Sequence, residues 1–138
     1  MNIRQAKKTD LDSVYKLAKA LATSFKVEKE SFEKAFTETL KNQNMRIFVL
    51  SEDNNIVGYV MGIYHYAFYA NGLVAWVEEL YVAEESRGKN YGKMLMSAIE
   101  NNAQKSGCKL LSLSTRRASE FYKSIGYEES ATYFKKTF

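Results

Sequence analysis

Residues 77–95 read VEELYVAEESRGKNYGKML, and the character of the chain changes twice within this stretch. It begins as an apolar run typical of a strand, passes through a loop with Arg87, Lys89 and Lys93 around two glycines, and continues with helical spacing. The first amides of a helix lack intrahelical acceptors, and the helix dipole adds about half a positive charge there. The stretch therefore predicts an anion cradle, with phosphate as the preferred guest.

Two common phosphate-binding patterns are missing from this loop. It contains neither the GxxxxGK[ST] pattern of nucleoside triphosphate sites nor the GxGxxG pattern of dinucleotide sites. Its three cations match the charge that two phosphates require. We therefore expect a diphosphate-bearing ligand of another kind.

Length and composition limit the number of domains and the kinds of metal or disulfide site. A chain of 138 residues with 46% hydrophobic and 14% aromatic residues predicts one packed domain, residues 1–138. Cys108 is the single cysteine and His65 the single histidine, so no intramolecular disulfide can form, these two residues cannot complete a zinc centre, and no metal is expected. A reducing, cytoplasmic location is the natural expectation.

Charge and hydropathy indicate the class of partner. The first ten residues, MNIRQAKKTD, contain no signal core, and no window approaches the about 18 apolar residues of a membrane span, so no membrane partner is expected. The net charge of +4 suits an anionic ligand, but both signs of charge are spread along the predicted helices. Without a basic stripe, we expect no nucleic-acid partner.

Periodicity and caps predict the order of elements. Strands are expected at 2–6, at 45–51 and 56–66 (an antiparallel hairpin across EDNN), at 73–82, at 109–114 and in the extended end 127–138. Helices are expected after the start signal of Thr9 and Asp12, at 29–41, from 91 to a cap at Gly107, and at 119–125. This order predicts an α/β fold, with a mixed, mostly antiparallel central sheet flanked by helices on both faces.

The opening stretch resembles the acetyl-CoA motif of the GNAT N-acetyltransferases, which reads apolar-x-apolar, a spacer, then R/Q-x-x-G-x-G/A. Arg87 and Gly92 match this pattern, and Asn90 stands at its first glycine, where asparagine tolerates a left-handed backbone. A second stretch, FYKSIGYE at 121–128, resembles the FYxxxGF helix of the same family. The order of elements resembles the GNAT fold as well, so the resemblance covers nearly the whole chain.

The resemblance implies acetyl-CoA as cosubstrate and a set of cofactor-binding residues. The loop amides would bind its pyrophosphate, and the strand before them would pair with the pantetheine arm. These residues are Arg87, Gly88, Lys89, Asn90, Tyr91, Gly92 and Lys93 in the loop, and Leu80, Tyr81 and Val82 in the strand. Thr115 either contacts the cofactor or only caps the last helix. Arg116 and Arg117 either add a phosphate contact or form a solvated pair.

Transfer of an acetyl group to an amine needs a base, because an unperturbed primary amine has a pKa of about 10.4. Glu78 and Glu79 interrupt an otherwise apolar strand, and neighbouring strand residues are expected to point to opposite faces. The resemblance favours Glu78 as base, with the acidic neighbour helping to hold a cationic amine. Alternatively, one glutamate pairs with Arg117 or faces water.

The other two requirements concern the thioester. A backbone N–H near Val82 could polarise its carbonyl oxygen. Tyr122 matches the family tyrosine that protonates the coenzyme A sulfur; the alternative is a core aromatic residue beside Phe121. Cys108 invites an acyl-cysteine mechanism, but no base is apparent near it, so a buried structural thiol is favoured.

The leading hypothesis is an N-acetyltransferase that works by direct attack in a ternary complex on a small cationic amine. The acidic pair supports this acceptor, as do four aromatic residues of the predicted hairpin: Tyr64, Tyr66, Phe68 and Tyr69. Alternatives are a protein lysine or N-terminal acetyltransferase, a non-catalytic acyl-CoA sensor, and a basic nucleic-acid adaptor. Aromatic residues near the C-terminus would allow a homodimer through the last strands.

Overall fold

A five-stranded sheet forms the centre of the molecule. The computed structural model describes all of residues 1–138. Its strands, in spatial order, are β1 (Asn2–Gln5), β2 (Met45–Glu52), β3 (Asn55–Ala67), β4 (Gly72–Val82) and β5 (Leu111–Leu113). The first four pair antiparallel, and β5 is parallel to β4. This confirms the predicted mixed, mostly antiparallel sheet and the predicted hairpin.

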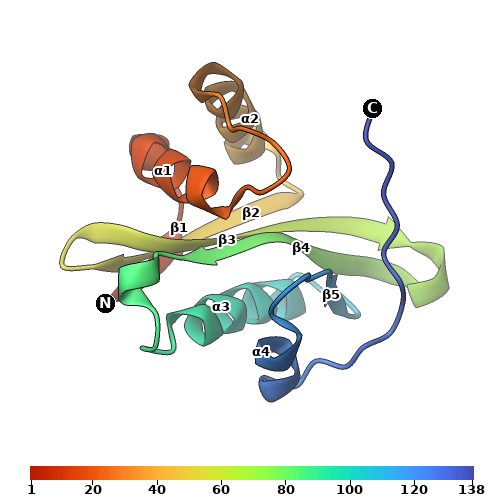
Figure 1. Ribbon diagram of the computed structural model, residues 1–138. Helices are drawn as coiled ribbons and strands as arrows, with labels where there is room; N and C mark the ends of the chain where they lie inside the picture. The colour runs from red at the N-terminus through yellow and green to blue at the C-terminus, as the bar shows by residue number, and fades with distance from the viewer.

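Helices cover both faces of the sheet (Figure 1). One face carries α1 (Leu11–Leu21) and α2 (Lys29–Lys41), and the other carries α3 (Tyr91–Lys105) and α4 (Ser119–Ser124). Each face has its own buried cluster. The α1/α2 cluster is Val14, Leu17, Ala18, Phe36, Ile47, Val49 and Tyr59. The α3 cluster is Leu50, Val60, Tyr64, Ala75, Val77, Leu95, Met96, Ile99 and Ala103.

Close contact between α3 and the sheet depends on one glycine. A Cβ atom at Gly62 would lie 2.9 Å from Cδ1 of Ile99, closer than side chains tolerate. The glycine in the middle of β3 thus lets α3 lie directly on the strand.

The start of α1 differs from its sequence signal. The helix is preceded by a short 3-10 turn (Lys8–Asp10), and Asp10 is its N-cap residue rather than Thr9. The Asp10 carboxylate is 4% exposed, accepts the Lys7 N–H (2.8 Å), and pairs with two nitrogens of Arg4 (2.7 and 2.9 Å). The predicted Thr9–Asp12 signal is therefore wrong in detail, because Asp12 instead forms an exposed ion pair with Lys29 (2.6 Å).

The predicted strand at the C-terminus does not form. Residues 127–138 have no regular secondary structure, and in Figure 1 they run from α4 past the β3–β4 ribbon to the side of the sheet that carries α2. Side-chain contacts hold this tail: Tyr133 stacks on Trp76 with 6.5 Å between centroids, and Lys135 Nζ donates to Ser24 Oγ (3.3 Å). The tail adds no strand to the sheet, and β5 remains its edge.

The sheet opens between β4 and β5. The β4–β5 ladder joins residues 75–77 to residues 111–113, and Lys109 N–H also donates to Leu73 O (2.8 Å). The regular strand β5 is thus shorter than the predicted 109–114, and β4 beyond Val77 has a free edge. On its other edge β4 shifts register against β3, because Met61 pairs with Glu79 while Gly62 pairs with Val77. Glu78 is the extra residue of a β-bulge at the point where the strands separate. No helix has the length and apolar character needed to cross a bilayer.

Candidate functional site

A cavity of about 800 Å³ lies where β4 and β5 separate. Its wall comes from the end of α1, residues 77–82 of β4, the loop and first turn of α3, residues 113–118 after β5, and α4. The cavity therefore brings together the two sequence motifs, which lie some thirty residues apart along the chain. All the predicted site residues line it except Lys89: Glu78, Glu79, Leu80, Tyr81, Val82, Arg87, Gly88, Asn90, Tyr91, Gly92, Lys93, Thr115 and Tyr122.

The loop before α3 presents an unbroken run of free amides. The main-chain N–H groups of residues 88–93 have no acceptor within the protein. Gly88 (φ 81°) and Asn90 (φ 65°) adopt left-handed conformations, so asparagine takes the conformation expected of it at the glycine position. Consecutive free amides ahead of a helix are the arrangement that anion-binding sites use, and the sequence predicted such a site in this loop.

Cationic side chains surround this run, with one exception. Arg87, Lys93, Arg116 and Arg117 all line the cavity. Lys89 does not, because its ammonium group lies 2.9 Å from a carboxylate oxygen of Glu52 on β2. The Lys89 side chain thus faces Glu52 rather than the cavity, and its contact with a phosphate stays a prediction.

The free edge of β4 offers further donors. Ala83 N–H donates to Val57 O (2.7 Å), so these two residues form a hydrogen-bonded pair of the β3–β4 ladder. Because such pairs alternate in antiparallel sheets, the N–H groups of Leu80 and Val82 point away from β3, toward the open side. An extended ligand could therefore pair with this edge as a strand would.

Both strand carboxylates lie on the α1/α2 face, contrary to the prediction of opposite faces. Glu79 Oε1 accepts the hydroxyl of Tyr59 (2.6 Å), which belongs to the α1/α2 cluster. Glu78 Oε2 accepts the indole N–H of Trp76 (2.7 Å), and Trp76 lies between two residues that face α3. The bulge at Glu78 breaks the two-residue alternation on which the prediction depended. Neither glutamate pairs with Arg117.

Tyr122 lies in the wall of the cavity on α4. Its ring packs edge-on against Phe121 (centroids 4.9 Å apart, 72°) and Tyr127 (5.8 Å, 75°). Burial raises the pKa of its phenol above the ordinary value, and the hydroxyl has no hydrogen-bond partner within the protein. The group is thus a protonated donor at neutral pH, and the ring also has the packing role that the sequence left as the alternative.

The sequence also singled out Thr115, Cys108 and His65, and only Thr115 lines the cavity. Thr115 Oγ1 accepts the N–H of Ala118 (3.0 Å), the N-cap residue of α4, so Thr115 holds the turn that leads into this helix and also lines the cavity. Burial raises the pKa of the Cys108 thiol, which packs beside the α3 cluster. His65 is exposed and lies outside the cavity.

The four hairpin aromatics do not reach the cavity either. Tyr64 is buried and donates to Asn102 Oδ1 (2.6 Å) on α3, and desolvation raises its pKa to about 12. Tyr66, Phe68 and Tyr69 are exposed at the far end of the β3–β4 hairpin. They therefore give no support to a cationic acceptor, and the acidic pair alone carries that expectation.

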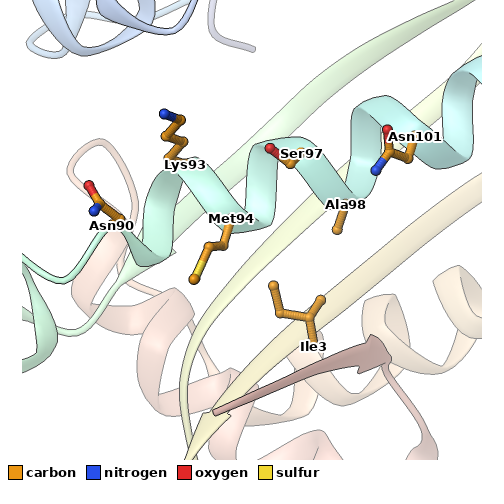
Figure 2. A pocket seen from close by; sticks show the side chains of 7 residues that line it. All are labelled: Ile3, Asn90, Lys93, Met94, Ser97, Ala98 and Asn101. Atoms are coloured by element: carbon orange, nitrogen blue, oxygen red, sulfur yellow. The ribbon is translucent and has the colours of Figure 1, made fainter.

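A second, shallower cavity of about 520 Å³ lies on the other side of the α3 start. Figure 2 shows Met94 and Ala98 on the side of α3 that faces Ile3 of β1, with the Lys93 side chain pointing away from that strand. Asn90 and Lys93 border both cavities, so the first turn of α3 separates them.

Three contributions to the site had no signal in the sequence. Tyr59 and Trp76 hold the two carboxylates, and both read as ordinary aromatic residues of strands. The end of α1 and the residues after it supply Ala20, Leu21 and Thr23 to the wall.

No group of three or more His, Cys, Asp or Glu side chains is arranged to hold a metal ion. Together the site offers an anion cradle, an open strand edge, two carboxylates and one phenol.

Comparison with known proteins places the chain among acetyltransferases. Residues 43–129, well over half of the chain, match the family model described as an acetyltransferase (GNAT) domain. The chain is 26% identical to a thialysine N-epsilon-acetyltransferase from Bos taurus over 144 residues, which covers 92% of this chain and 84% of that protein.

Solved structures show the same fold at lower identity. A transcriptional regulator from Bacillus halodurans C-125 superposes with a TM-score of 0.88 at 24% identity, covering 99% of both chains. Glucosamine-6-phosphate N-acetyltransferase from Arabidopsis thaliana superposes with a TM-score of 0.87 at 22% identity, covering 99% of this chain and 97% of that one.

Proposed function

The chain belongs to the GNAT acetyltransferase family and is an acetyl-CoA-dependent N-acetyltransferase, and from this premise we propose that it acetylates a small cationic amine by direct attack in a ternary complex. One observation carries the proposal: a single cavity holds the run of free amides, the two strand carboxylates and the Tyr122 phenol. Each group corresponds to one requirement of the reaction.

The residues present fit coenzyme A. A diphosphate needs several donors that converge on one point, and the amides of residues 88–93 are free to donate. Arg87 and Lys93 line the same cavity and supply compensating charge. The outward amides of Leu80 and Val82 would pair with the amide groups of the pantetheine arm. When bound, acetyl-CoA supplies the activated acyl group.

The carboxylates would act on the amine. Glu78 is exposed at the bulge and is oriented by the Trp76 indole, and we assign it the role of base, directly or through a water. Glu79 is half-buried and held by the Tyr59 hydroxyl, and we assign it the role of holding the cation. Two negative charges on one side of the cavity would attract an ammonium group and stabilise it there.

The remaining groups would act on the thioester. Whichever of the Leu80 and Val82 N–H groups the pantetheine arm leaves unpaired would donate to the carbonyl oxygen as negative charge develops on it. Tyr122 would give its proton to the departing sulfur. The ammonium group would lose one proton to Glu78 before attack and a second to solvent as the N–C bond forms and the C–S bond breaks, while Tyr122 would give one proton to sulfur. Glu78 would then release its proton to solvent and Tyr122 would regain one, so the net reaction releases one proton.

Two observations support a small amine as acceptor. The acidic pair supplies charge complementarity for a cation. The names of the thialysine and glucosamine-6-phosphate enzymes specify small amines as the acceptors of those proteins.

An amine panel tests the proposal. The protein is incubated with acetyl-CoA and single amines, including thialysine, lysine, polyamines, aminoglycosides and lysine peptides, and free thiol is followed over time. We expect turnover with at least one small cationic amine and slower turnover with peptides. Preference for peptides would overturn the acceptor assignment, and tight acetyl-CoA binding without turnover of any amine would favour a regulatory module instead.

A further inference from the structure

We propose that Glu52 is a positioning residue for the phosphate loop, residues 87–93, which it holds in the binding conformation from outside the cavity. This inference rests on the proposed function, because it assumes that the loop binds the diphosphate of the cosubstrate. Glu52 is the last residue of β2, far from the loop in the sequence, and no motif marks it.

One carboxylate oxygen of Glu52 joins two side chains of the loop. Oε2 accepts from Lys89 Nζ (2.9 Å) and from the hydroxyl of Tyr91. Lys89 and Tyr91 are alternate residues within the run of free amides. Their side chains are held from the β2 side, while the main chain between them stays free to face the cavity.

The main chain of the loop is itself weakly held. Backbone hydrogen bonds occur only at its borders, from Arg87 N–H to Glu84 O (3.3 Å) and from Met94 N–H to Asn90 O (3.0 Å). At the start of the loop, Arg87 Nε donates to Val82 O (3.0 Å), and its guanidinium lies 5.2 Å from the Tyr81 ring centre. Side-chain contacts at both ends therefore fix the conformation, and Glu52 provides two of them.

The charge of Glu52 and its contacts with the loop should change the affinity for the cosubstrate in opposite directions. A carboxylate beside an anion site should weaken anion binding by simple electrostatics. The contacts with Tyr91 and, next, with Lys89 hold the pKa of Glu52 below its usual range, so the group is ionised at neutral pH. Removing the side chain should tighten cosubstrate binding if charge dominates and weaken it if positioning dominates. The sign of the effect decides between the two.

The expected effect is about tenfold. Without Glu52, one or two loop residues would be disordered in the free protein and would have to be ordered on binding, which costs about this factor in affinity. We discount the ion pair as a source of global stability, since exposed pairs of this kind contribute little. The melting temperature should therefore change little.

Calorimetric titration with acetyl-CoA is the primary test. We expect Glu52→Ala to raise Kd about tenfold and Glu52→Gln, which keeps an acceptor oxygen without the charge, to raise it less. Glu85→Ala is the matched control, because it removes the same charge two residues before Arg87 from a side chain without an ion pair. The control should bind equally well or slightly tighter.

Acetyl-pantetheine, which lacks the diphosphate, separates positioning from general damage. We expect Glu52→Ala to leave kcat/KM for acetyl-pantetheine unchanged while kcat/KM for acetyl-CoA falls. If Glu52→Ala does not fold, Lys89→Met and Tyr91→Phe each remove one contact and are expected to weaken acetyl-CoA binding in the same direction.

Two outcomes would overturn the inference. One is unchanged or tighter binding of acetyl-CoA by the folded Glu52 variants, and the other is an equal loss with both thioesters. A wild-type protein that binds no acetyl-CoA would contradict the proposed function itself, so the two failures are distinguishable.

Discussion

Replacing Tyr122 with phenylalanine should separate catalysis from packing. The substitution deletes one hydroxyl that has no partner within the protein, so no buried group loses a hydrogen bond. The ring keeps its edge-on contacts with Phe121 and Tyr127, at 4.9 and 5.8 Å between centroids. We therefore expect the free energy of unfolding to change by less than about 0.5 kcal/mol.

The rate of the chemical step should fall much further. Loss of a general acid costs about 10²-fold or more, and 10²-fold corresponds to about 2.7 kcal/mol in the activation barrier. Because burial raises the pKa of Tyr122 above its ordinary value, the wild-type phenol stays protonated and can donate throughout the usual assay range. The Kd for acetyl-CoA should stay within about twofold, since the hydroxyl would contact only the sulfur.

Single-turnover measurements of free thiol are the appropriate assay, because they exclude product release from the observed rate. Tyr127→Phe is the matched control: its hydroxyl donates to Glu100, away from the cavity, so that variant should lose about 1 kcal/mol of stability and keep its rate. A Tyr122→Phe variant with a rate within twofold of wild type would refute the assignment and leave Tyr122 as a packing residue.

Three further predictions follow from the site and from the start of α1. Gly92→Glu should abolish acetyl-CoA binding in calorimetry, because the new carboxylate would enter the run of free amides and the new Cβ would lie 3.3 Å from Phe121. Gly92→Ala, which adds only the Cβ, should bind more weakly than wild type but measurably. Normal binding by the glutamate variant would contradict the anion cradle. Glu78→Gln should abolish the fall in rate on the acid side of the pH–rate profile, because that fall reports protonation of the base. Glu79→Gln should keep this fall and raise the KM for the amine. If both variants keep the wild-type profile, neither residue is the base. Arg4 holds the pKa of Asp10 below its usual range, so the stability that ionised Asp10 contributes is present above pH ~4 and is lost as pH falls through the lowered pKa. The urea midpoints of wild type and Asp10→Asn should therefore differ at pH 7 and converge in acid. A difference that stays constant with pH would argue against the ion pair.

The fold followed from local patterns, because most elements carry their own signal. The stripe of Phe32, Phe36 and Leu40 predicted α2, and the apolar strands on either side of EDNN predicted the β2–β3 hairpin. The C-terminal strand failed for the opposite reason. Residues 127–138 have the aromatic content of a strand, but a strand requires a neighbour, and sequence patterns do not reveal whether one is available.

The residues that line the cavity were largely predictable, but their geometry was not. Motif spacing pointed to the loop and to Tyr122, since both belong to short continuous segments, and both line the cavity. The shared face of Glu78 and Glu79 depends on a bulge whose register is set by β3, and the orientation of Lys89 depends on Glu52. Contacts between residues far apart in the chain leave no local periodic trace, so strand alternation alone gave the wrong face.

A crystal structure with bound acetyl-CoA tests the central claim most directly. The account predicts diphosphate oxygens within hydrogen-bond distance of the amides of residues 88–93, the pantetheine arm along the free edge of β4, and the sulfur next to the Tyr122 hydroxyl. A nucleotide bound elsewhere on the protein, with those amides turned to other acceptors, would contradict it.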